Sequence, residues 1–123
     1  MKILCIEDNA SNMHVVQRLA AALGYELLAA THGQEGLALV GQTPDIILMD
    51  ISLPDMDGLT LTHQIRAMLP DTPIIAVTAH ALPDDRQKCL AAGCTDYLSK
   101  PYRILELVAL LQKYARNWET MSS

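Results

Sequence analysis

The stretch Asp45-Ile46-Ile47-Leu48-Met49-Asp50 places four consecutive apolar residues between two carboxylates. A run of this kind lacks helical length, and its isoleucines are typical of a strand buried on both faces. Similar short runs occur along the 123-residue chain at 2–6, 73–77 and 95–98, with a weaker one at 26–31. The sequence therefore predicts five strands, of which 45–49 is the third and 26–31 lies at an edge.

Helices are expected between these strands, because the intervening segments carry apolar residues at helical spacing. The expected helices cover about 11–23, 34–41, 58–69, Pro83 to Gly93 and 102–116. Asn9 suits the N-cap of the first helix, and Gly24 suits the left-handed cap that ends it.

This alternation of strands and helices predicts an α/β fold with a single doubly wound, five-stranded parallel sheet. Right-handed crossovers leave few strand orders, and we expect the order 2-1-3-4-5 of flavodoxin-like (βα)5 proteins. Such proteins bind ligands at the carboxyl ends of strands 1 and 3. We expect the domain to cover residues 1–118, followed by a short C-terminal tail at 119–123.

Composition excludes several functional classes. The chain has 9 basic and 14 acidic residues, whereas binding to a nucleic-acid backbone needs a clustered basic surface. No apolar stretch approaches the roughly 20 residues that span a bilayer, and acidic residues follow Met1 too soon for a signal peptide. We therefore expect a cytoplasmic protein that contacts neither nucleic acid nor membrane directly.

The three cysteines, Cys5, Cys89 and Cys94, form neither an even disulfide set nor a CxxC metal pair. We expect reduced, buried thiols.

Polar residues suited to catalysis follow four of the predicted strands. They are Glu7 and Asp8 after the first strand, Asp50 after the third, Thr78 after the fourth and Lys100 closely after the fifth. Taken singly, each has a plain alternative: a capped loop, a hydrogen bond to backbone, or a solvated side chain. Because parallel strands end at one edge of a sheet, the set as a whole predicts a site there.

A cluster of Glu7, Asp8 and Asp50 would be repulsive unless it bound a cation or one carboxyl group took up a proton. Mg²⁺ prefers carboxylates, waters and phosphate oxygens, which makes it the expected ion. Asp8 and Asp50 are the expected direct ligands, and Glu7 is expected to hold a coordinated water.

Five motifs give the chain, from residue 2 to about 116, a resemblance to the receiver domains of two-component response regulators. These motifs are Glu7-Asp8-Asn9, Leu48-Met49-Asp50, Pro54-Asp55-Met56-Asp57-Gly58, Thr78-Ala79 and Lys100-Pro101. The resemblance implies that Asp50 is the phosphoacceptor and that Lys100 contacts the phosphoryl group. It also implies that Asp8, Asp50 and the backbone carbonyl of Ser52 hold Mg²⁺, for which Mn²⁺ is a substitute.

Other positions take their roles from the same resemblance. Thr78 and Tyr97 would form the switch pair, and Ser52 and His80 would influence the lifetime of the phosphoryl group. The alternatives are that Tyr97 is a half-buried aromatic residue of an edge strand and that His80 is a surface residue with no kinetic role. The surface formed by the fourth helix, the fifth strand and the fifth helix, roughly residues 84–116, would carry the signal to a downstream effector protein. In the first helix, Asn12, His14 and Val15 are candidates for contacting the phosphodonor, and the alternative is an ordinary solvated helix face. The histidines His14, His32 and His63 are expected at the surface.

The implied chemistry is phosphoryl transfer, with Asp50 as the nucleophile of an in-line displacement. Mg²⁺ and Lys100 would neutralise charge on the phosphoryl oxygens, and Thr78 would donate a hydrogen bond. The protein would be a signalling phosphoacceptor rather than an enzyme, catalysing only its own phosphorylation and dephosphorylation. The expected donor is a histidine kinase or histidine phosphotransfer protein, and the expected state is a monomer or a weak phosphorylation-dependent dimer.

The motifs look most like those of stand-alone cell-cycle regulators and of hybrid-kinase receivers. The chain starts just before the first predicted strand and ends soon after the last helix, so no DNA-binding output domain is expected. Both a stand-alone regulator and an excised receiver agree with this sequence.

Three alternative functions remain open at this point. A haloacid-dehalogenase-type phosphatase shares an aspartyl nucleophile, Mg²⁺ and a lysine, but usually has a second Asp two residues after the nucleophile, where this chain has Ser52. A flavodoxin-type cofactor carrier would share the fold, yet Glu7 and Asp8 would repel its phosphate. A phosphorylation-independent binding module would be favoured by the loss of Asp50, the acid pair or Lys100, and all of these are present.

Overall fold

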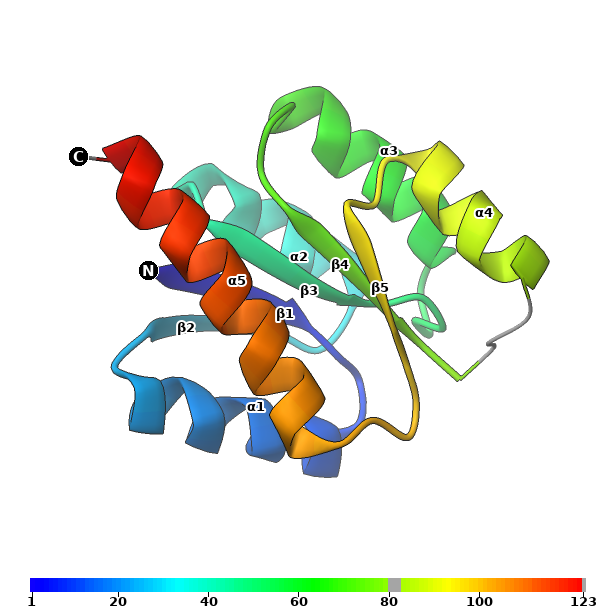
Figure 1. Cartoon of the computed structure of the whole chain (residues 1–123). Helices are drawn as coiled ribbons and strands as arrows, with labels where there is room; N and C mark the ends of the chain where they lie inside the picture. The colour runs from blue at the N-terminus through cyan, green and yellow to red at the C-terminus, as the bar shows by residue number, and fades with distance from the viewer. Residues whose placement is uncertain (80–82, 123) are drawn as a thin grey trace.

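A computed structural model describes the backbone of residues 1–79 and 83–122, and side chains at 1–79 and 85–115. This part of the chain forms one parallel sheet of five strands, with the order β2-β1-β3-β4-β5 (Figure 1). The strands are β1 (Lys2–Ile6), β2 (Glu26–Ala30), β3 (Ile46–Asp50), β4 (Ile74–Thr78) and β5 (Asp96–Ser99). The predicted fold class and strand order are confirmed.

Five α-helices connect and follow the strands within the described residues. They are α1 (Ala10–Leu23), α2 (Gly33–Leu39), α3 (Gly58–Met68), α4 (Pro83–Ala92) and α5 (Ile104–Ser122). A 3-10 turn, η1 (Val40–Gln42), continues α2, so the segment expected as one helix at 34–41 is divided in two. Figure 1 shows α1 and α5 on one face of the sheet and α2, α3 and α4 on the other.

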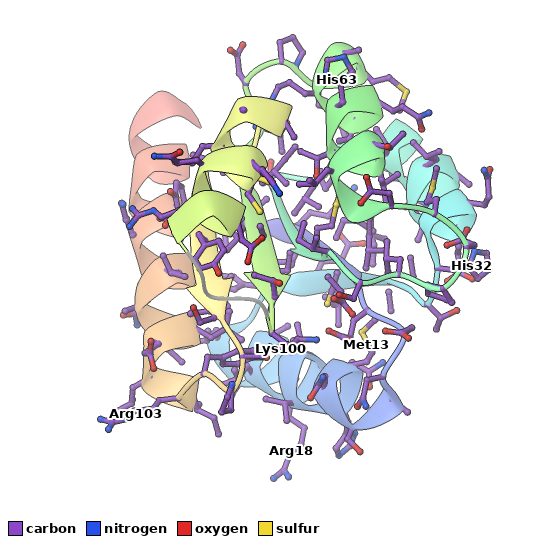
Figure 2. The ribbon with its side chains drawn as sticks, turned by 90° about the vertical axis from the view of Figure 1, so that its right-hand side faces the viewer. Met13, Arg18, His32, His63, Lys100 and Arg103 are labelled. Carbon is purple, nitrogen blue, oxygen red and sulfur yellow. The ribbon has the colours of Figure 1, made fainter. Side chains whose placement is uncertain are left out.

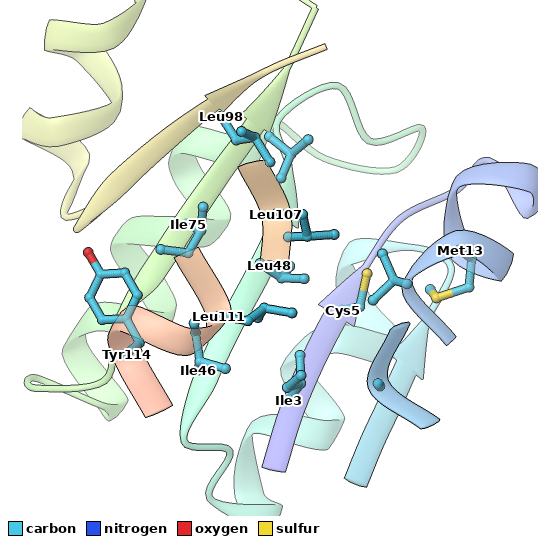
Figure 3. Packing of buried hydrophobic residues seen from close by; sticks show 13 residues of the cluster. Ile3, Cys5, Met13, Ile46, Leu48, Ile75, Leu98, Leu107, Leu111 and Tyr114 are labelled. Atoms are coloured by element: carbon cyan, nitrogen blue, oxygen red, sulfur yellow. The ribbon is translucent and has the colours of Figure 1, made fainter. Parts of the chain in front are cut away.

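Alternate residues of each central strand face the two layers of helices, because successive strand side chains point to opposite sides. One buried cluster joins Ile3, Ile46 and Ile75 to side chains of α1 and α5 (Figure 3). The other joins Leu4 and Ile47 to α3, η1 and α4. The sheet is therefore covered on both faces, and the mainly apolar sequence of its central strands follows from this double burial.

Local capping agrees with the sequence in α1. The Asn9 side chain accepts the N–H of Asn12 at 2.9 Å, and Gly24 ends the helix with φ of 76°. The three cysteines are free and buried, as predicted. Burial raises the pKa of Cys5 to about 12, so this thiol is held in its neutral form at ordinary pH.

The last helix differs from the prediction in its length and in its buried face. It continues to Ser122 rather than ending near 116, and the sequence after Ala115 contains no glycine or proline to end it. Helical spacing predicted a buried stripe of Ile104, Val108, Leu111 and Ala115. Leu111 and Ala115 are buried as predicted and Val108 is partly buried, but Ile104 is 55% exposed and Leu107 is buried instead. Seven of the eight residues at 104–111 are apolar, so spacing alone fitted more than one face in these first two turns. The domain boundary at 118 stays a prediction.

Candidate functional site

The carboxyl ends of four neighbouring strands carry the residues expected in the site. Asp50 and Thr78 are the last residues of β3 and β4, while Glu7 and Lys100 follow β1 and β5 directly. The sheet ladder continues past the strand ends through hydrogen bonds from Glu7 N–H to the Ala30 carbonyl (2.9 Å), Ile51 N–H to the Val77 carbonyl (3.2 Å) and Lys100 N–H to the Thr78 carbonyl (2.7 Å). The backbone under each of these side chains is therefore fixed by the sheet.

Three carboxyl groups meet at this edge, as the sequence predicted. One carboxylate oxygen from each of Glu7, Asp8 and Asp50 lies within 4.8 Å of the others. Glu7 and Asp50 are each only 5% exposed, whereas Asp8 is exposed. The cluster thus consists of two buried carboxylates and one that faces solvent, an arrangement in which like charges repel.

Lys100 contributes the positive charge of the cluster. Its ammonium nitrogen lies 3.0 Å from Glu7 Oε2 and 3.5 Å from Asp50 Oδ2. Burial alone would lower the pKa of Lys100, but the hydrogen bond and charge of Glu7, followed by the charge of Asp50, raise the pKa overall. Lys100 is therefore held as a cation between two carboxylates. Its peptide bond to Pro101 is cis.

The other oxygen of each buried carboxylate is held by a backbone N–H. Glu7 Oε1 accepts the N–H of Asn9 at 3.1 Å, and Asp50 Oδ1 accepts the N–H of Ser52 at 3.0 Å. Each side chain thus presents one oxygen to its own loop and one to Lys100. The ion pair between Glu7 and Lys100 was missed from the sequence, because 93 positions separate the two residues and each already had an expected role.

Thr78 and Tyr97 lie on the same face of the sheet. Thr78 is 2% exposed, and strand alternation places its side chain on the side of Ile74 and Ala76, which pack toward α3 and α4. Tyr97, on the neighbouring strand β5, packs against the same cluster and is half-buried. The fold therefore places both members of the expected switch pair on the side of α4.

The remaining predicted residues lie at or near the site edge, or outside the described residues. Ser52 is exposed on the loop after β3, and His80 falls in the segment that the structure does not describe. His14 and His63 are exposed, and Figure 2 shows His63 on α3 well apart from Lys100. His32, expected as a surface residue, has a side chain that is 44% exposed, and it also caps α2 and lies near two carboxylates.

An open cavity of about 400 Å³ adjoins Lys100 between α1 and the start of α5. Asn12 and Val15, two of the three residues of α1 expected to contact a phosphodonor, line it together with Ala79, Lys100, Pro101, Tyr102 and Ile104. His14 does not line it. The cavity therefore lies on the Lys100 side of the cluster.

The donor atoms of the cluster suit Mg²⁺. They are carboxylate oxygens, which hard divalent cations prefer, and the exposed Asp8 leaves one side of the cluster open to water and incoming ligands.

Within the described residues, no helix has the length and apolar character needed to cross a membrane.

Sequence comparisons agree with this geometry. The family model of the response regulator receiver domain matches residues 3–112. The polar-differentiation response regulator DivK of Brucella anthropi is 36% identical over 115 residues, covering 91% of this chain and 94% of DivK. Hybrid signal transduction histidine kinase G of Dictyostelium discoideum is 41% identical over 120 residues, covering 93% of this chain. The chain spans only 4% of that kinase and 13% of the sensor protein GacS of Pseudomonas syringae.

Solved structures show the same fold. A CheY-like response regulator receiver domain protein from Methanospirillum hungatei superposes with a TM-score of 0.90 at 27% identity, covering 98% of this chain and 97% of that one. The receiver domain of the sensor histidine kinase PA1611 from Pseudomonas aeruginosa has a TM-score of 0.83 at 40% identity, covering 92% of this chain and 95% of that one. That structure contains a magnesium ion coordinated in its active-site cleft.

Proposed function

This chain belongs to the response regulator receiver domain family, and from that premise we propose that Asp50 accepts a phosphoryl group from a phosphohistidine. The observation that carries the proposal is the environment of the Asp50 carboxylate. It is buried, its Oδ1 accepts the Ser52 N–H at 3.0 Å, and its Oδ2 lies 3.5 Å from the Lys100 ammonium. A carboxylate held in one orientation beside a cation is a well-placed nucleophile for phosphoryl transfer.

In the proposed reaction, an oxygen of Asp50 forms a bond to phosphorus while the bond from phosphorus to the donor imidazole nitrogen breaks. The electron pair of that bond stays on the nitrogen, which can then take up a proton from water. The donor is a histidine kinase or a histidine phosphotransfer protein. The chain acts as a signalling phosphoacceptor, and loss of its own phosphoryl group by hydrolysis is part of this proposal.

Asp8, Asp50 and the backbone carbonyl of Ser52 would hold Mg²⁺, and Glu7 would hold one of its waters. When bound, the ion would neutralise negative charge on the transferred phosphoryl oxygens, and Mn²⁺ is proposed to replace it. Lys100 neutralises charge from the other side. Because the phosphoryl group carries about −1.5 to −2 charges in place of the single charge of the Asp50 carboxylate, it should draw the Lys100 ammonium away from Glu7 and toward Asp50.

The proposed signal passes through Thr78 and Tyr97. The phosphoryl oxygens are strong acceptors and should attract the Thr78 hydroxyl, which vacates space on the side of α4. Tyr97 would then turn inward and alter the surface formed by α4, β5 and α5, which a downstream effector protein contacts. Ser52 and His80 are proposed to set the lifetime of the adduct.

The wider setting of the chain is also part of the proposal. We place it in the cytoplasm, as a monomer or a weak phosphorylation-dependent dimer, either as a stand-alone regulator or as one domain of a larger kinase. DivK matches it over nearly its whole length, whereas the hybrid kinases match it over a small part of theirs.

A test of the proposal is incubation with acetyl phosphate and Mg²⁺, followed by the intact mass of the protein. We expect a single phosphoryl adduct that is stable in acid and labile in base, and that fails to form when a chelator removes the metal. A phosphatase would instead release inorganic phosphate through many turnovers without a lasting adduct. A phosphorylation-independent binding module would gain no mass at all.

A further inference from the structure

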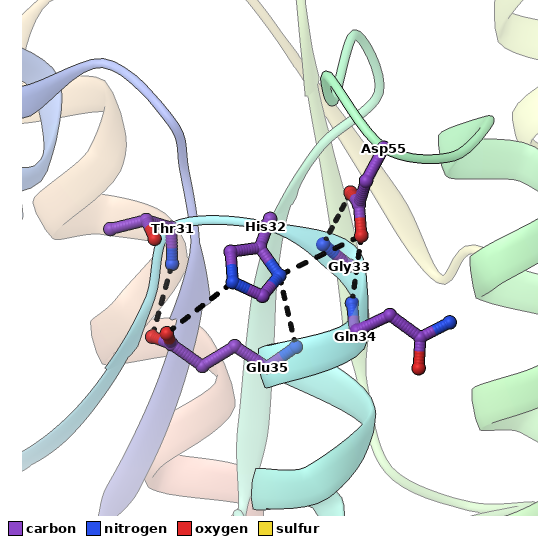
Figure 4. Close-up of polar contacts among 6 residues, drawn as sticks. All are labelled: Thr31, His32, Gly33, Gln34, Glu35 and Asp55. Atoms are coloured by element: carbon purple, nitrogen blue, oxygen red, sulfur yellow. Dashed lines mark hydrogen bonds and ion pairs between the residues drawn. The ribbon is translucent and has the colours of Figure 1, made fainter.

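The loop between β3 and α3, residues 51–57, is attached to the start of α2 by one side chain. Asp55 Oδ1 accepts the N–H of Gly33 at 2.8 Å, and Asp55 Oδ2 accepts the N–H of Gln34 at 3.1 Å (Figure 4). These bonds cross 22 and 21 positions of the sequence. They join the loop that follows Asp50 to the first turn of α2, the helix that follows strand β2.

Close packing reinforces this attachment. A Cβ atom at Gly33 would collide with the side chain of Met56, so the loop lies directly against the helix backbone. At the other end of the loop, the Gly58 N–H binds the Ile51 carbonyl at 3.2 Å, and a Cβ at Gly58 would collide with the Ile51 backbone. The loop is thus closed at its ends by its own residues and held in its middle by α2.

The polar surroundings of Asp55 keep its carboxylate in the charged, accepting form. The Gly33 N–H lowers the pKa of Asp55 most, burial opposes that effect, and the Gln34 N–H lowers the pKa further. His32 lies next to this carboxylate: its Nδ1, which accepts the N–H of Glu35 at 3.3 Å, is 3.6 Å from Asp55 Oδ2. The charged groups around His32 are therefore Asp55 from the loop and Glu35 from α2, as Figure 4 shows.

Ser52, three positions before Asp55, contributes only its backbone carbonyl to the proposed metal site. A backbone ligand cannot adjust by side-chain rotation, so its position depends on how the loop is held. Two attachments lie on either side of this carbonyl: Ser52 N–H to Asp50 Oδ1, and Asp55 to α2. Pro54 stands between them, and its ring restricts both its own backbone and that of the preceding residue. Movement of Asp55 should therefore reach Ser52.

We propose that Asp55 is a positioning residue that tethers the loop to α2 and so holds the Ser52 carbonyl in place for Mg²⁺. The inference rests on the proposed function, since it presupposes a metal site that includes Ser52. Asp55 itself does not belong to the cluster of Glu7, Asp8 and Asp50.

The test compares three variants of the full chain in a Mg²⁺ titration followed by amide NMR. Asp55→Ala removes the tether, and Asp55→Asn keeps one acceptor oxygen. Asp57→Ala is the matched control, because it removes the same charge from the same loop. The Asp57 carboxylate contacts only Leu59 N–H and Thr60 Oγ1 within α3, each at 3.3 Å, among the described residues.

We expect Asp55→Ala to raise the dissociation constant for Mg²⁺ about 10-fold, as loss of an outer-shell partner commonly does. Asp55→Asn should fall between Asp55→Ala and the parent. Asp57→Ala should stay within about 3-fold of the parent, since an exposed charge is screened by salt. Amide hydrogen exchange at Gly33 and Gln34 should accelerate in Asp55→Ala, which reports loss of the tether independently of the metal.

Equal Mg²⁺ affinities in Asp55→Ala and Asp57→Ala would overturn the positioning role. If Asp55→Ala also unfolds at a much lower temperature, the milder variant Asp55→Asn takes its place. Equal Mg²⁺ affinities in Asp55→Asn and Asp57→Ala would then overturn the positioning role. Asp8→Ala separates this inference from the proposed function. If Asp8→Ala loses Mg²⁺ binding while Asp55→Ala binds normally, only the positioning role of Asp55 is contradicted. If Asp8→Ala binds Mg²⁺ as the parent does, the proposed metal site itself is contradicted.

Discussion

Lys100 lies closer to Glu7 than to Asp50, at 3.0 Å from Glu7 Oε2 and 3.5 Å from Asp50 Oδ2. The lysine proposed to neutralise the phosphoryl group is therefore already paired with a second carboxylate before that group arrives. This pairing keeps a cation in a buried site and leaves it free to move toward Asp50 when negative charge increases there.

Glu7→Gln should lower the pKa of Lys100, because the Glu7 carboxylate is the main favourable contact that raises it. The glutamine can still accept the Asn9 N–H, so the loop should keep its shape. NMR titration of the Lys100 side chain measures the effect, with Lys113, which pairs with Asp96 elsewhere, as a reference in the same sample. An unchanged Lys100 titration would show that Asp50 alone holds the ammonium.

Asp50→Asn should stabilise the protein when Mg²⁺ is absent, since it removes one of three crowded negative charges. We expect the free energy of unfolding to rise on the order of 1 kcal/mol, the scale of one pKa unit. Saturating Mg²⁺ should reduce or reverse this advantage, because the parent then gains from binding. A variant less stable than the parent without metal would mean that the Lys100–Asp50 attraction outweighs the repulsion.

Tyr114 gives the protein a predictable sensitivity to alkaline pH. Its hydroxyl donates to Asp96 Oδ2 at 3.0 Å, and burial, then Asp96, raise the pKa of Tyr114 from 10.0 to about 12. A pKa that is higher in the folded state means that the folded protein binds the Tyr114 proton more tightly than the unfolded chain does. The stability due to this group is complete below pH 10 and is lost as the pH rises toward 12.

Tyr114→Phe should therefore lower the free energy of unfolding by about 1 kcal/mol at pH 7, the usual net value of a hydrogen bond. Between pH 10 and 12 the parent should lose stability faster than the variant, so the two should converge. Urea unfolding across this pH range measures both. Parallel pH profiles would contradict the assigned hydrogen bond.

Thr78→Ala should leave phosphorylation largely intact and weaken the response of the α4-β5-α5 surface. Couplings of this kind are typically about 1–3 kcal/mol, or roughly 5- to 150-fold in partner affinity. The measurement is NMR of Tyr97 and the amides of 84–116, in parent and variant, with and without a beryllofluoride mimic of the phosphoryl group. Equal shifts in the two proteins would remove Thr78 from the relay.

Local sequence signals predicted most of the fold. Buried strands read as short apolar runs because both faces are covered, and Asn9 and Gly24 cap α1 through contacts within a few residues. The buried face of α5 was predicted correctly at Leu111 and Ala115 but not at the start of the helix, because nearly all residues at 104–111 are apolar and only packing on the sheet decides which of them are covered. Ile104 and Leu107 illustrate the two outcomes, exposed and buried.

Contacts between distant segments were the main features that the sequence did not reveal. From the sequence alone, Arg66 is an ordinary charged residue on the third helix. In the structure its guanidinium donates hydrogen bonds to the carbonyls of Leu69, Pro70, Thr72 and Gly93 and to Thr95 Oγ1. The contact of Asp55 with α2 and the ion pair between Glu7 and Lys100 likewise join distant segments, so they could be identified only from the structure. The meeting of Glu7, Asp8 and Asp50 was predictable, since strand ends in a parallel sheet share one edge, and the roles of these residues stay predictions.

The proposed site of phosphorylation, Asp50, can be identified chemically. The acetyl-phosphate-labelled protein is treated with borohydride, which reduces an acyl phosphate to an alcohol, and the reduced residue is located by peptide mass spectrometry. We expect one modified peptide, with homoserine at position 50, and no modification in Asp50→Asn carried through the same treatment. A reduced residue at Asp8 or Glu7, or an adduct of normal yield in Asp50→Asn, would contradict this assignment.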